Sequence, residues 1–322
     1  MGGKYKTAGK KLAFSIVGLT ASGKTSFLHS LIDRILDLDI SFVTISVDSG
    51  AIYKYLDIGT AKPSIEERTK YRYRLVDVIN PCERYSLARF ISDVDSILKS
   101  ERVDLIFLVG GTPLYFYTLV GERGYVPVEP DNVLRQHLYE LARSRGKQYI
   151  YDLMKQLDPI SAIKIHPNDL KRIIRTLEIV LSTGKMRVYS TLFYDYFVSH
   201  FREYRYIFIP PTDVLRERIK QRIIYMFENG WIEETAFLAN TCPPPAPWFE
   251  VLGYKHIYDL YIGKIKKQDA IENIFLDTWK FARRQRTWFR KDKLGMLIRS
   301  EEEVQYARES IIKHISEYSR NR

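Results

Sequence analysis

A strand-like apolar run opens directly into residues whose types suit phosphate binding. Residues 14–25 read FSIVGLTASGKT, in which a glycine, four residues, a second glycine, a lysine and a hydroxyl residue follow one another. In such a G-x-x-x-x-G-K-[ST] loop, successive backbone N–H groups point into one concavity, the lysine adds positive charge and the hydroxyl can bind magnesium. The candidate phosphate ligands are therefore Gly18, Leu19, Thr20, Ala21, Ser22, Gly23, Lys24 and Thr25.

Polar residues and glycines follow two further apolar runs. ISFVTISVD places Asp48 and Ser49 where a strand should end, and open α/β sheets bind ligands at the carboxyl ends of their strands. A carboxylate there can act as a general base, although Asp and Ser are also common turn and capping residues. VDLIFLVGGTPLY ends in Gly110, Gly111 and Thr112, which permit either a close backbone approach to a ligand or a simple tight turn. A common NTPase would carry an acidic residue there, so routine nucleotide hydrolysis is disfavoured.

A parallel sheet would position these residues together. The runs AFSIVG, ISFVTISVD and VDLIFLVGG alternate with helix-like spans at 26–38 and 86–98, which predicts a parallel sheet covered on both faces. A fourth strand, YRYIFIP at 204–210, follows helical periodicity over 133–181. We expect an α/β fold, with a phosphate-loop (P-loop NTPase-like) parallel sheet core and an inserted helical domain. The predicted domains are the N-terminal part of the core at 1–121, a helical insertion contacting the tRNA anticodon stem-loop at 122–200, and the remaining core with basic C-terminal helices at 201–322.

Composition is that of an ordinary globular protein with a basic surplus. Of 322 residues, 45% are hydrophobic and 28% are charged, and no apolar run reaches the roughly 18 residues needed to span a membrane. Cys82 and Cys242 lie far apart and match no C-x-x-C pattern, which excludes a metal knuckle and favours a reducing compartment. The N-terminus lacks an apolar signal core, and CPPPAP at 242–247 is interpreted as a stiff spacer. The formal net charge of +11 hints at a polyanionic partner.

Five sequence blocks, in one order, resemble the tRNA dimethylallyltransferases, also called tRNA isopentenyltransferases. The blocks are GLTASGKT, DSGAIYKYLDIGTAKP, GGTPLYF, HPNDLKRIIRTLEIVLSTGK and FARRQRTWFR, within residues 14–290. The phosphate loop alone is common, but five collinear blocks are specific. Members of this family transfer the dimethylallyl group of dimethylallyl diphosphate to the exocyclic N6 amine of the adenosine 3′ of the anticodon in tRNA, releasing diphosphate.

The resemblance implies roles for the candidate residues. The phosphate loop and Arg222 would hold the donor diphosphate, with Thr25 on Mg²⁺, and stabilise the charge of the leaving group. Asp48 would take the proton of the acceptor amine, and Thr112 would hydrogen-bond substrate at the reacting centre. Arg218, one helical turn from Arg222, is interpreted as a solvated charge. The implied tRNA contacts are Asp48, Ser49, Gly50, Ala51, Thr112, Lys171, Arg172, Arg175, Gly253, Tyr254, Arg283, Arg284, Gln285 and Arg286.

The segment at 280–293 also suits RNA. It carries seven basic residues against one acidic residue, a net charge of 7 − 1 = +6, interleaved with Phe281, Trp288 and Phe289. Basic and stacking side chains together suit single-stranded nucleic acid. An amphipathic helix with aromatics in the core and arginines in solvent would give the same pattern, and for the aromatics we favour that interpretation. The family often has glutamine two residues after its Ser, where this chain has Ala51, so a contact to the base edge is in doubt.

Three other classes are weighed against this interpretation. An adenylate isopentenyltransferase shares the loop and the aspartate but generally lacks the full insertion and the basic C-terminal block. A phosphate-loop kinase should carry an arginine-rich lid and has no reason to keep GTAKP or GGTPLY. A non-catalytic RNA-binding protein would be expected to have lost Lys24, Thr25 or Asp48, which are all present. We predict a cytoplasmic, monomeric, Mg²⁺-dependent prenyltransferase with no membrane partner, acting on dimethylallyl diphosphate and the tRNA anticodon stem-loop.

Overall fold

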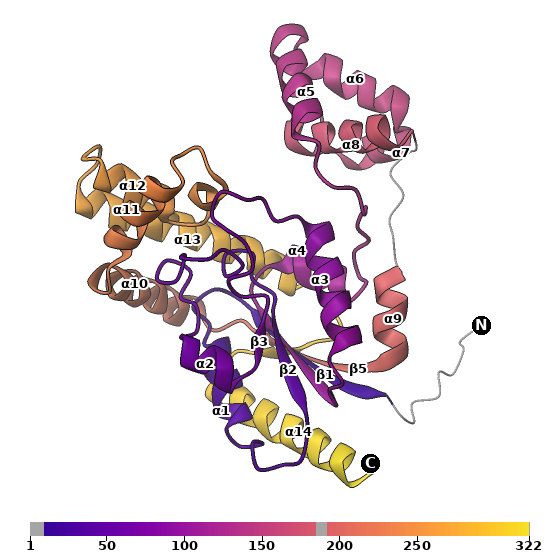
Figure 1. Ribbon diagram of the computed structural model, residues 1–322, viewed down its shortest axis with the longest axis vertical. Coiled ribbons are helices and arrows are strands. Elements are labelled where there is room, and N and C mark those ends of the chain that lie inside the picture. The colour runs from indigo at the N-terminus through magenta and orange to yellow at the C-terminus, as the bar shows by residue number, and fades with distance from the viewer. Residues whose placement is uncertain (1–9, 185–191, 322) are drawn as a thin grey trace.

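A parallel six-stranded sheet organises the chain (Figure 1). The computed structural model describes residues 10–184 and 192–321. The strand order is β3-β2-β4-β1-β5-β6, and every pairing is parallel. The predicted α/β fold with a P-loop-like parallel core is confirmed. The strands are β1 (Lys11–Gly18), β2 (Phe42–Ser46), β3 (Tyr73–Arg74), β4 (Leu105–Gly110), β5 (Phe201–Phe208) and β6 (Met296–Ile298).

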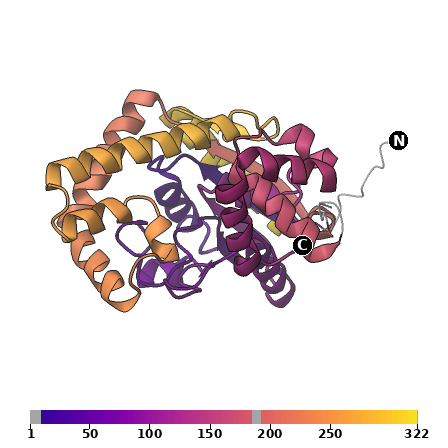
Figure 2. The same cartoon turned by 90° about the horizontal axis from the view of Figure 1, so that it is seen from above.

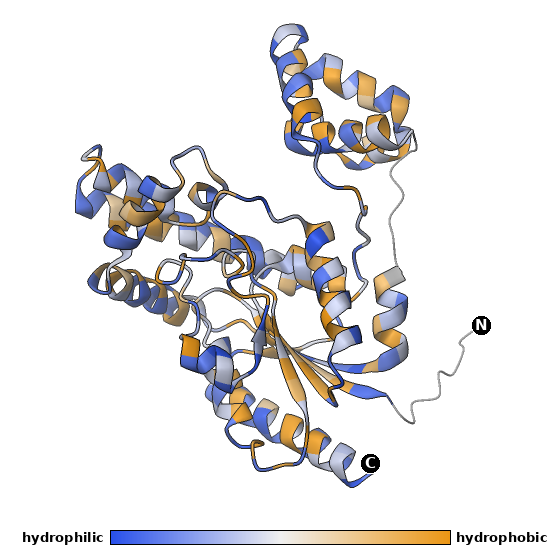
Figure 3. Ribbon diagram, in the orientation of Figure 1, coloured by the Kyte–Doolittle hydropathy of each residue, from blue (hydrophilic) through white to orange (hydrophobic). Residues whose placement is uncertain are grey.

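The central strand β1 divides two hydrophobic cores. Its side chains alternate, so Ala13 and Val17 face one core while Phe14 and Ile16 face the other. Helices α1 and α14 cover the second core, and the first is covered by α3, α4, α9 and α10–α13. Burial on both faces explains why the strands are the most continuous hydrophobic segments in Figure 3. Around the sheet lie α1 (Lys24–Ile32), α2 (Ile65–Lys70), α3 (Leu87–Ser100), α4 (Pro113–Leu119), α9 (Leu192–His200) and α14 (Glu301–Arg320).

The long stretch with helical periodicity forms a separate helical cluster. It begins with α5, one residue before the predicted start at 133, and projects away from the sheet in Figure 1. Its helices pack on a core of their own that includes Ile150, Met154 and Leu177. Helix α9, which follows, packs instead on α4 and β5. The cluster comprises α5 (Asn132–Arg145), α6 (Lys147–Leu157), α7 (Pro159–Lys164) and α8 (Leu170–Thr183).

A second helical group follows β5. Seen from above in Figure 2, this group and the α5–α8 cluster lie on opposite sides of the sheet. Its long helix α13 packs against α10 and α12 and returns to the core at α4 and β1. Among the described residues, no helix is long and apolar enough to cross a membrane. The group comprises α10 (Thr212–Glu228), α11 (Trp231–Thr241), the 3-10 turn η1 (Pro247–Glu250), α12 (Tyr254–Tyr261) and α13 (Lys267–Phe289).

The two cysteines form a disulfide. Cys82 and Cys242 are 160 residues apart in the sequence, but their Cα atoms are 5.7 Å apart. The cysteine-based argument for a reducing compartment is therefore wrong, because sequence separation says nothing about distance in the fold. The bond links the loop after β3 to the end of α11, so the segment CPPPAP is fastened at its first residue.

Candidate functional site

The phosphate-binding loop turns from β1 into α1. Gly18 at the end of β1 has a φ of 144°, and a Cβ there would lie 2.2 Å from the Phe208 carbonyl oxygen. Gly23 is the N-cap of α1 in the left-handed conformation, with a φ of 91°. Both positions therefore require glycine. The loop consequently delivers its N–H groups and the positive end of α1 to one place, as anion binding needs.

Lys24 is buried in this loop. Its ammonium donates hydrogen bonds to the Leu19 carbonyl oxygen and, at 3.3 Å, to the Ser22 hydroxyl. Burial lowers the pKa of Lys24 from 10.5 to about 7, and the nearby Asp48 carboxylate only partly offsets that effect. A bound anion would restore the charge that burial disfavours.

Asp48 follows β2 and faces the same cavity. Its Oδ1 accepts the N–H of Gly50 at 2.8 Å and that of Ala51 at 3.4 Å. The turn-capping interpretation is therefore correct, but it uses a single carboxylate oxygen, and Asp48 also lines the cavity that contains Lys24. Capping and chemistry are compatible at this residue.

Thr112 joins the ends of β2 and β4. Its Oγ1 accepts the N–H of Ser49 at 3.0 Å and donates to the Ser49 hydroxyl at 3.2 Å, while its own N–H bonds to the Val47 carbonyl at 3.1 Å. At Gly110 a Cβ would lie 2.1 Å from the Val47 carbonyl oxygen, so the two strand ends approach as closely as glycine allows. Thr112 thus fixes the turn that carries Asp48.

One cavity of about 120 Å³ collects most of the candidate residues. It lies at the carboxyl ends of β1, β2 and β4, where open α/β sheets bind ligands. The structure thereby brings Lys24, Thr25 and Asp48 together. The lining residues are Thr20, Lys24, Thr25, Ser46, Asp48, Ala51, Thr60, Ala61, Lys62, Pro63, Tyr73, Val109, Gly110, Gly111, Arg222, Phe281 and Gln285.

Two arginines of α10 reach the phosphate-binding loop. Arg222 is half-buried and donates to the Thr60 carbonyl at 3.1 Å and to the Thr20 hydroxyl at 3.5 Å. Burial lowers its pKa, an effect that Asp48 opposes. Arg218 is exposed, as its solvated interpretation requires, yet it donates to the Ser22 carbonyl at 3.3 Å. Arg222 therefore borders the cavity and Arg218 borders the outside of the loop.

Gln285 bridges two loops from the interior. Its amide accepts the N–H of Thr20 at 2.9 Å and donates to the Gly111 carbonyl at 2.5 Å. It is 1% exposed, and a Cβ on Gly111 would lie 2.7 Å from its nitrogen. The Thr20 N–H is thus already used by the protein, which leaves the later N–H groups of the loop for a ligand.

The other residues implied as tRNA contacts fall into three places. Lys171 borders a separate cavity of about 590 Å³ between α5, α8 and the Arg84–Glu250 ion pair. Gly253 and Tyr254 lie inward against Trp231. Their assignment stays a prediction. The remaining side chains are Arg172, bonded to Asp169; Arg175, bonded to Glu178 and to the Val128 carbonyl; Arg283 and Arg284, both exposed; and Arg286, bonded to Thr212 and to the Pro210 carbonyl.

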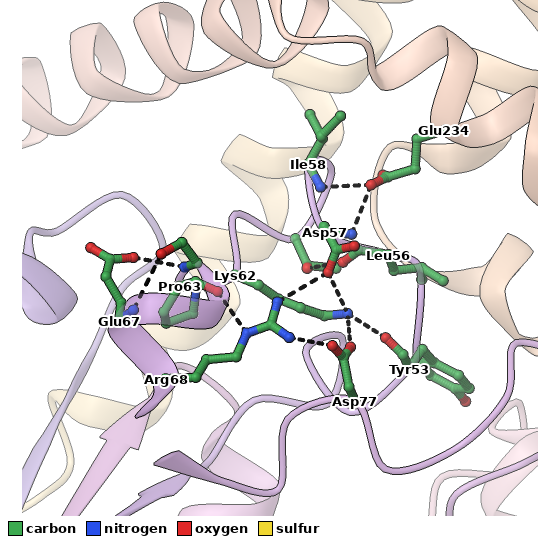
Figure 4. Close-up of polar contacts among 12 residues, drawn as sticks. Tyr53, Leu56, Asp57, Ile58, Lys62, Pro63, Glu67, Arg68, Asp77 and Glu234 are labelled. Atoms are coloured by element: carbon green, nitrogen blue, oxygen red, sulfur yellow. Dashed lines mark hydrogen bonds and ion pairs between the residues drawn. The ribbon is translucent and has the colours of Figure 1, made fainter. Parts of the chain in front are cut away.

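The loop Leu56–Pro63 is the site element that sequence reasoning missed. Thr60, Lys62 and Pro63 line the cavity, although the motif LDIGTAKP by itself predicts no role for them. Figure 4 shows the polar contacts that hold this loop, including those of Glu234 from α11. Its signal was present as the motif GTAKP, but Glu234 lies 175 residues from Gly59 and carries no motif of its own.

Comparisons with known proteins agree with this geometry. The family model of IPP transferases matches residues 51–292. The tRNA dimethylallyltransferase of Carboxydothermus hydrogenoformans is 36% identical over 86% of this chain and 88% of the relative, and that of Hydrogenobaculum is 34% identical over 93% and 98%. Among solved structures, the full-length tRNA isopentenylpyrophosphate transferase of Bacillus halodurans matches 97% of this chain and 99% of its own with a TM-score of 0.66 at 30% identity. A eukaryotic dimethylallyltransferase acting on tRNA matches 87% of this chain and 70% of its own, with a TM-score of 0.68 at 25% identity.

Proposed function

This chain belongs to the IPP transferase family and acts as a tRNA dimethylallyltransferase, and we propose that the cavity at the strand ends is where dimethylallyl diphosphate meets tRNA. The observation that carries the proposal is the meeting of Lys24, Arg222 and Asp48 in one cavity. Two cations suit a departing diphosphate, and one carboxylate suits an amine that must lose a proton.

The donor diphosphate takes the place beside the phosphate-binding loop. As the carbon–oxygen bond of the donor breaks, negative charge grows on the leaving diphosphate, and fixed positive groups stabilise it. Lys24, Arg222 and the N-terminus of α1 supply those groups. The absence of a carboxylate at the end of β4, where Gly110 stands, fits a loop that releases diphosphate rather than one that hydrolyses a nucleotide.

Mg²⁺ fits this arrangement through Thr25. The hydroxyl side chain of Thr25 is exposed and lines the cavity. Within residues 10–184 and 192–321, no group of three or more His, Cys, Asp or Glu residues could hold a metal alone. Mg²⁺ typically takes one or two protein oxygens and completes its shell with water and phosphate oxygens. Such an ion would neutralise part of the diphosphate charge.

Asp48 serves the acceptor. The exocyclic amine of adenine is a weak nucleophile, because its lone pair is delocalised into the ring. The Asp48 carboxylate keeps one oxygen beyond its turn contacts and can accept the amine proton as the new bond forms. The adenosine 3′ of the anticodon must leave its stack to reach this depth, and unpaired loop bases are the least costly to extrude.

The anticodon stem-loop rests on residues around the cavity. We assign to it Ser49, Gly50, Ala51 and Thr112 at the strand ends, Lys171 and its neighbours on α8, and the exposed Arg283 and Arg284 on α13. The reaction takes place in the cytoplasm, where tRNA is available. A monomer suffices, since a single chain supplies every group that lines the cavity.

The function is tested by following labelled dimethylallyl diphosphate. Incubation with bulk tRNA or with AMP, each with Mg²⁺, should place the label in tRNA at an adenosine next to the anticodon and release one diphosphate per transfer. Label in AMP but not in an anticodon stem-loop would instead identify an adenylate isopentenyltransferase. ATP hydrolysis without prenyl transfer would identify an NTPase.

The exposed arginines of α13 should set tRNA affinity by neutralising phosphates of the RNA backbone. Replacing Arg283 and Arg284 with alanine should weaken tRNA binding and flatten its salt dependence by roughly 0.7 to 0.9 in log–log slope for each phosphate that is no longer neutralised. The donor KM should not change. Filter binding across a salt series measures the slope, and Lys313→Ala on the exposed side of α14 is a matched control. An unchanged slope in the double variant would show that both arginines face only solvent.

A further inference from the structure

The loop Leu56–Pro63 separates two cavities and supplies no reacting group. Thr60 and Lys62 line the cavity that contains Lys24 and Asp48. Gly59 lines a smaller, mostly apolar cavity of about 40 Å³. Arg222 borders both cavities, so the position of this loop bears directly on the cation assigned to the donor.

A single carboxylate holds the first half of this loop. Oε2 of Glu234 accepts the N–H groups of Asp57 and Ile58, each at 2.7 Å. Oε1 accepts the N–H of Gly59 at 3.2 Å and the hydroxyl of Tyr254 at 2.6 Å. Three successive N–H groups thus converge on one anion, and both oxygens accept two bonds each, which is the full capacity of a carboxylate.

The loop lies as close to α11 and α12 as its glycine allows. A Cβ on Gly59 would lie 2.2 Å from Nε1 of Trp231 and 2.6 Å from the Cζ of Tyr254. Both rings are buried, with exposures of 1% and 0%. A displacement of the loop toward these helices is blocked, and a displacement away from them breaks the bonds to Glu234.

An ionic network holds the second half of the loop (Figure 4). Lys62 has a fully buried side chain and pairs with Asp57 at 3.2 Å and Asp77 at 2.5 Å. Arg68 donates to the Pro63 carbonyl at 2.7 Å and pairs with both aspartates. The segment between Gly59 and Lys62 is therefore fixed from both sides.

Arg222 is held by that fixed segment. Its guanidinium donates to the Thr60 carbonyl at 3.1 Å, whereas its contact with the Thr20 hydroxyl is long, at 3.5 Å. The Thr60 carbonyl is thus the firmer of the two partners that orient the guanidinium. Preorganised cations stabilise a leaving group more than mobile ones do, because they are not reoriented during the reaction.

We propose that Glu234 is a positioning residue for donor binding: it fixes the loop Asp57–Gly59 and thereby holds the Thr60 carbonyl that orients Arg222 toward the diphosphate. This proposal rests on the assignment of Arg222 to the donor diphosphate. It gives the GTAKP motif a task, since its glycine permits the approach to α11, its threonine binds Arg222 and its lysine anchors the far end.

Glu234→Gln tests the proposal, with Glu233→Gln as the matched control. Glutamine can keep the bonds of only one carboxylate oxygen, so the loop loses about half of its anchor. Glu233 is the exposed neighbour on the same helix. We expect Glu234→Gln to raise both the Kd of inorganic diphosphate, measured calorimetrically with Mg²⁺, and the KM of dimethylallyl diphosphate about tenfold, equivalent to about 1.4 kcal/mol. The Kd of tRNA should stay within about twofold, and Glu233→Gln should match the unaltered protein.

A double-mutant cycle separates positioning from general stability. If Glu234 acts through Arg222, Glu234→Gln should have little further effect on diphosphate binding in an Arg222→Lys background, because lysine cannot make the same paired contacts. Additive losses, or an equal loss of tRNA and diphosphate affinity, would overturn the proposal. Tyr254→Phe removes one bond from the same carboxylate and should give a smaller change of the same kind even if Glu234→Gln fails to fold; a Tyr254→Phe effect confined to tRNA would also overturn it. Failure of the unaltered protein to prenylate tRNA would reject the proposed function, while the diphosphate cycle would still judge the role of Glu234.

Discussion

Replacing Asp48 with asparagine should slow prenyl transfer by about a hundredfold to ten-thousandfold, the usual value of a general base. Asparagine keeps a carbonyl oxygen that can accept the N–H groups of Gly50 and Ala51, so the turn after β2 should survive. It removes the charge that accepts the amine proton. The rate must be measured in single turnovers at saturating donor, because Asp48 also raises the pKa of Lys24, and its loss should weaken donor binding as well.

Other measurements distinguish this role from capping alone. The Kd of tRNA should barely change in Asp48→Asn, and thermal unfolding should show a loss of at most about 1 kcal/mol, the typical cost of a weakened cap. If Asp48 only fixed the turn, the rate would follow that small loss of stability. Normal single-turnover rates in the folded variant would exclude the general-base role and leave the departing diphosphate as the proton acceptor.

The sequence predicted the parts of the fold that have strong local signals. Four apolar runs correspond to β1, β2, β4 and β5, because buried parallel strands are hydrophobic along their whole length. The short edge strands β3 (Tyr73–Arg74) and β6 (Met296–Ile298) were missed, since two or three residues carry no periodicity. Periodicity over 133–181 indicated helix but could not show where one helix ends, and the structure divides that stretch among α5, α6, α7 and α8.

The site divides in the same way between local and distant contacts. Lys24, Thr25 and Asp48 belong to motifs whose spacing is local, and the structure brings all three to one cavity. The bridge from Gln285 to Thr20 spans 265 residues, and the bond from Glu234 to Asp57 spans 177. Such pairings depend on how α11 and α13 dock, which no single-segment pattern encodes. The disulfide between Cys82 and Cys242 escaped prediction for the same reason.

Replacing Lys24 with alanine should lower kcat/KM for the donor by about a hundredfold to a thousandfold, as expected for loss of a group that stabilises developing charge. The fold should persist. Burial holds the pKa of Lys24 in the free protein at about 7, well below its ordinary 10.5, so the charged form is disfavoured there. Between these pH values the unfolded chain binds more protons at this position than the folded chain, so the contribution of Lys24 to the free energy of unfolding should rise with pH. Lys24→Ala should lack that slope in chemical unfolding across about pH 7–10.

Donor binding should show the opposite dependence on pH. A bound diphosphate favours the charged ammonium and raises the pKa of Lys24, so binding above a pH of about 7 requires uptake of a proton. Affinity should therefore be complete below that pH and fall by up to about tenfold per pH unit above it. Calorimetry in buffers of different ionisation enthalpy measures the proton uptake. Lys24→Arg is the matched control, because its guanidinium stays charged throughout and leaves only the titration of the diphosphate itself. Identical pH profiles for the unaltered protein and Lys24→Arg would mean that Lys24 is already charged before the donor arrives, and that burial in this loop does not set its protonation.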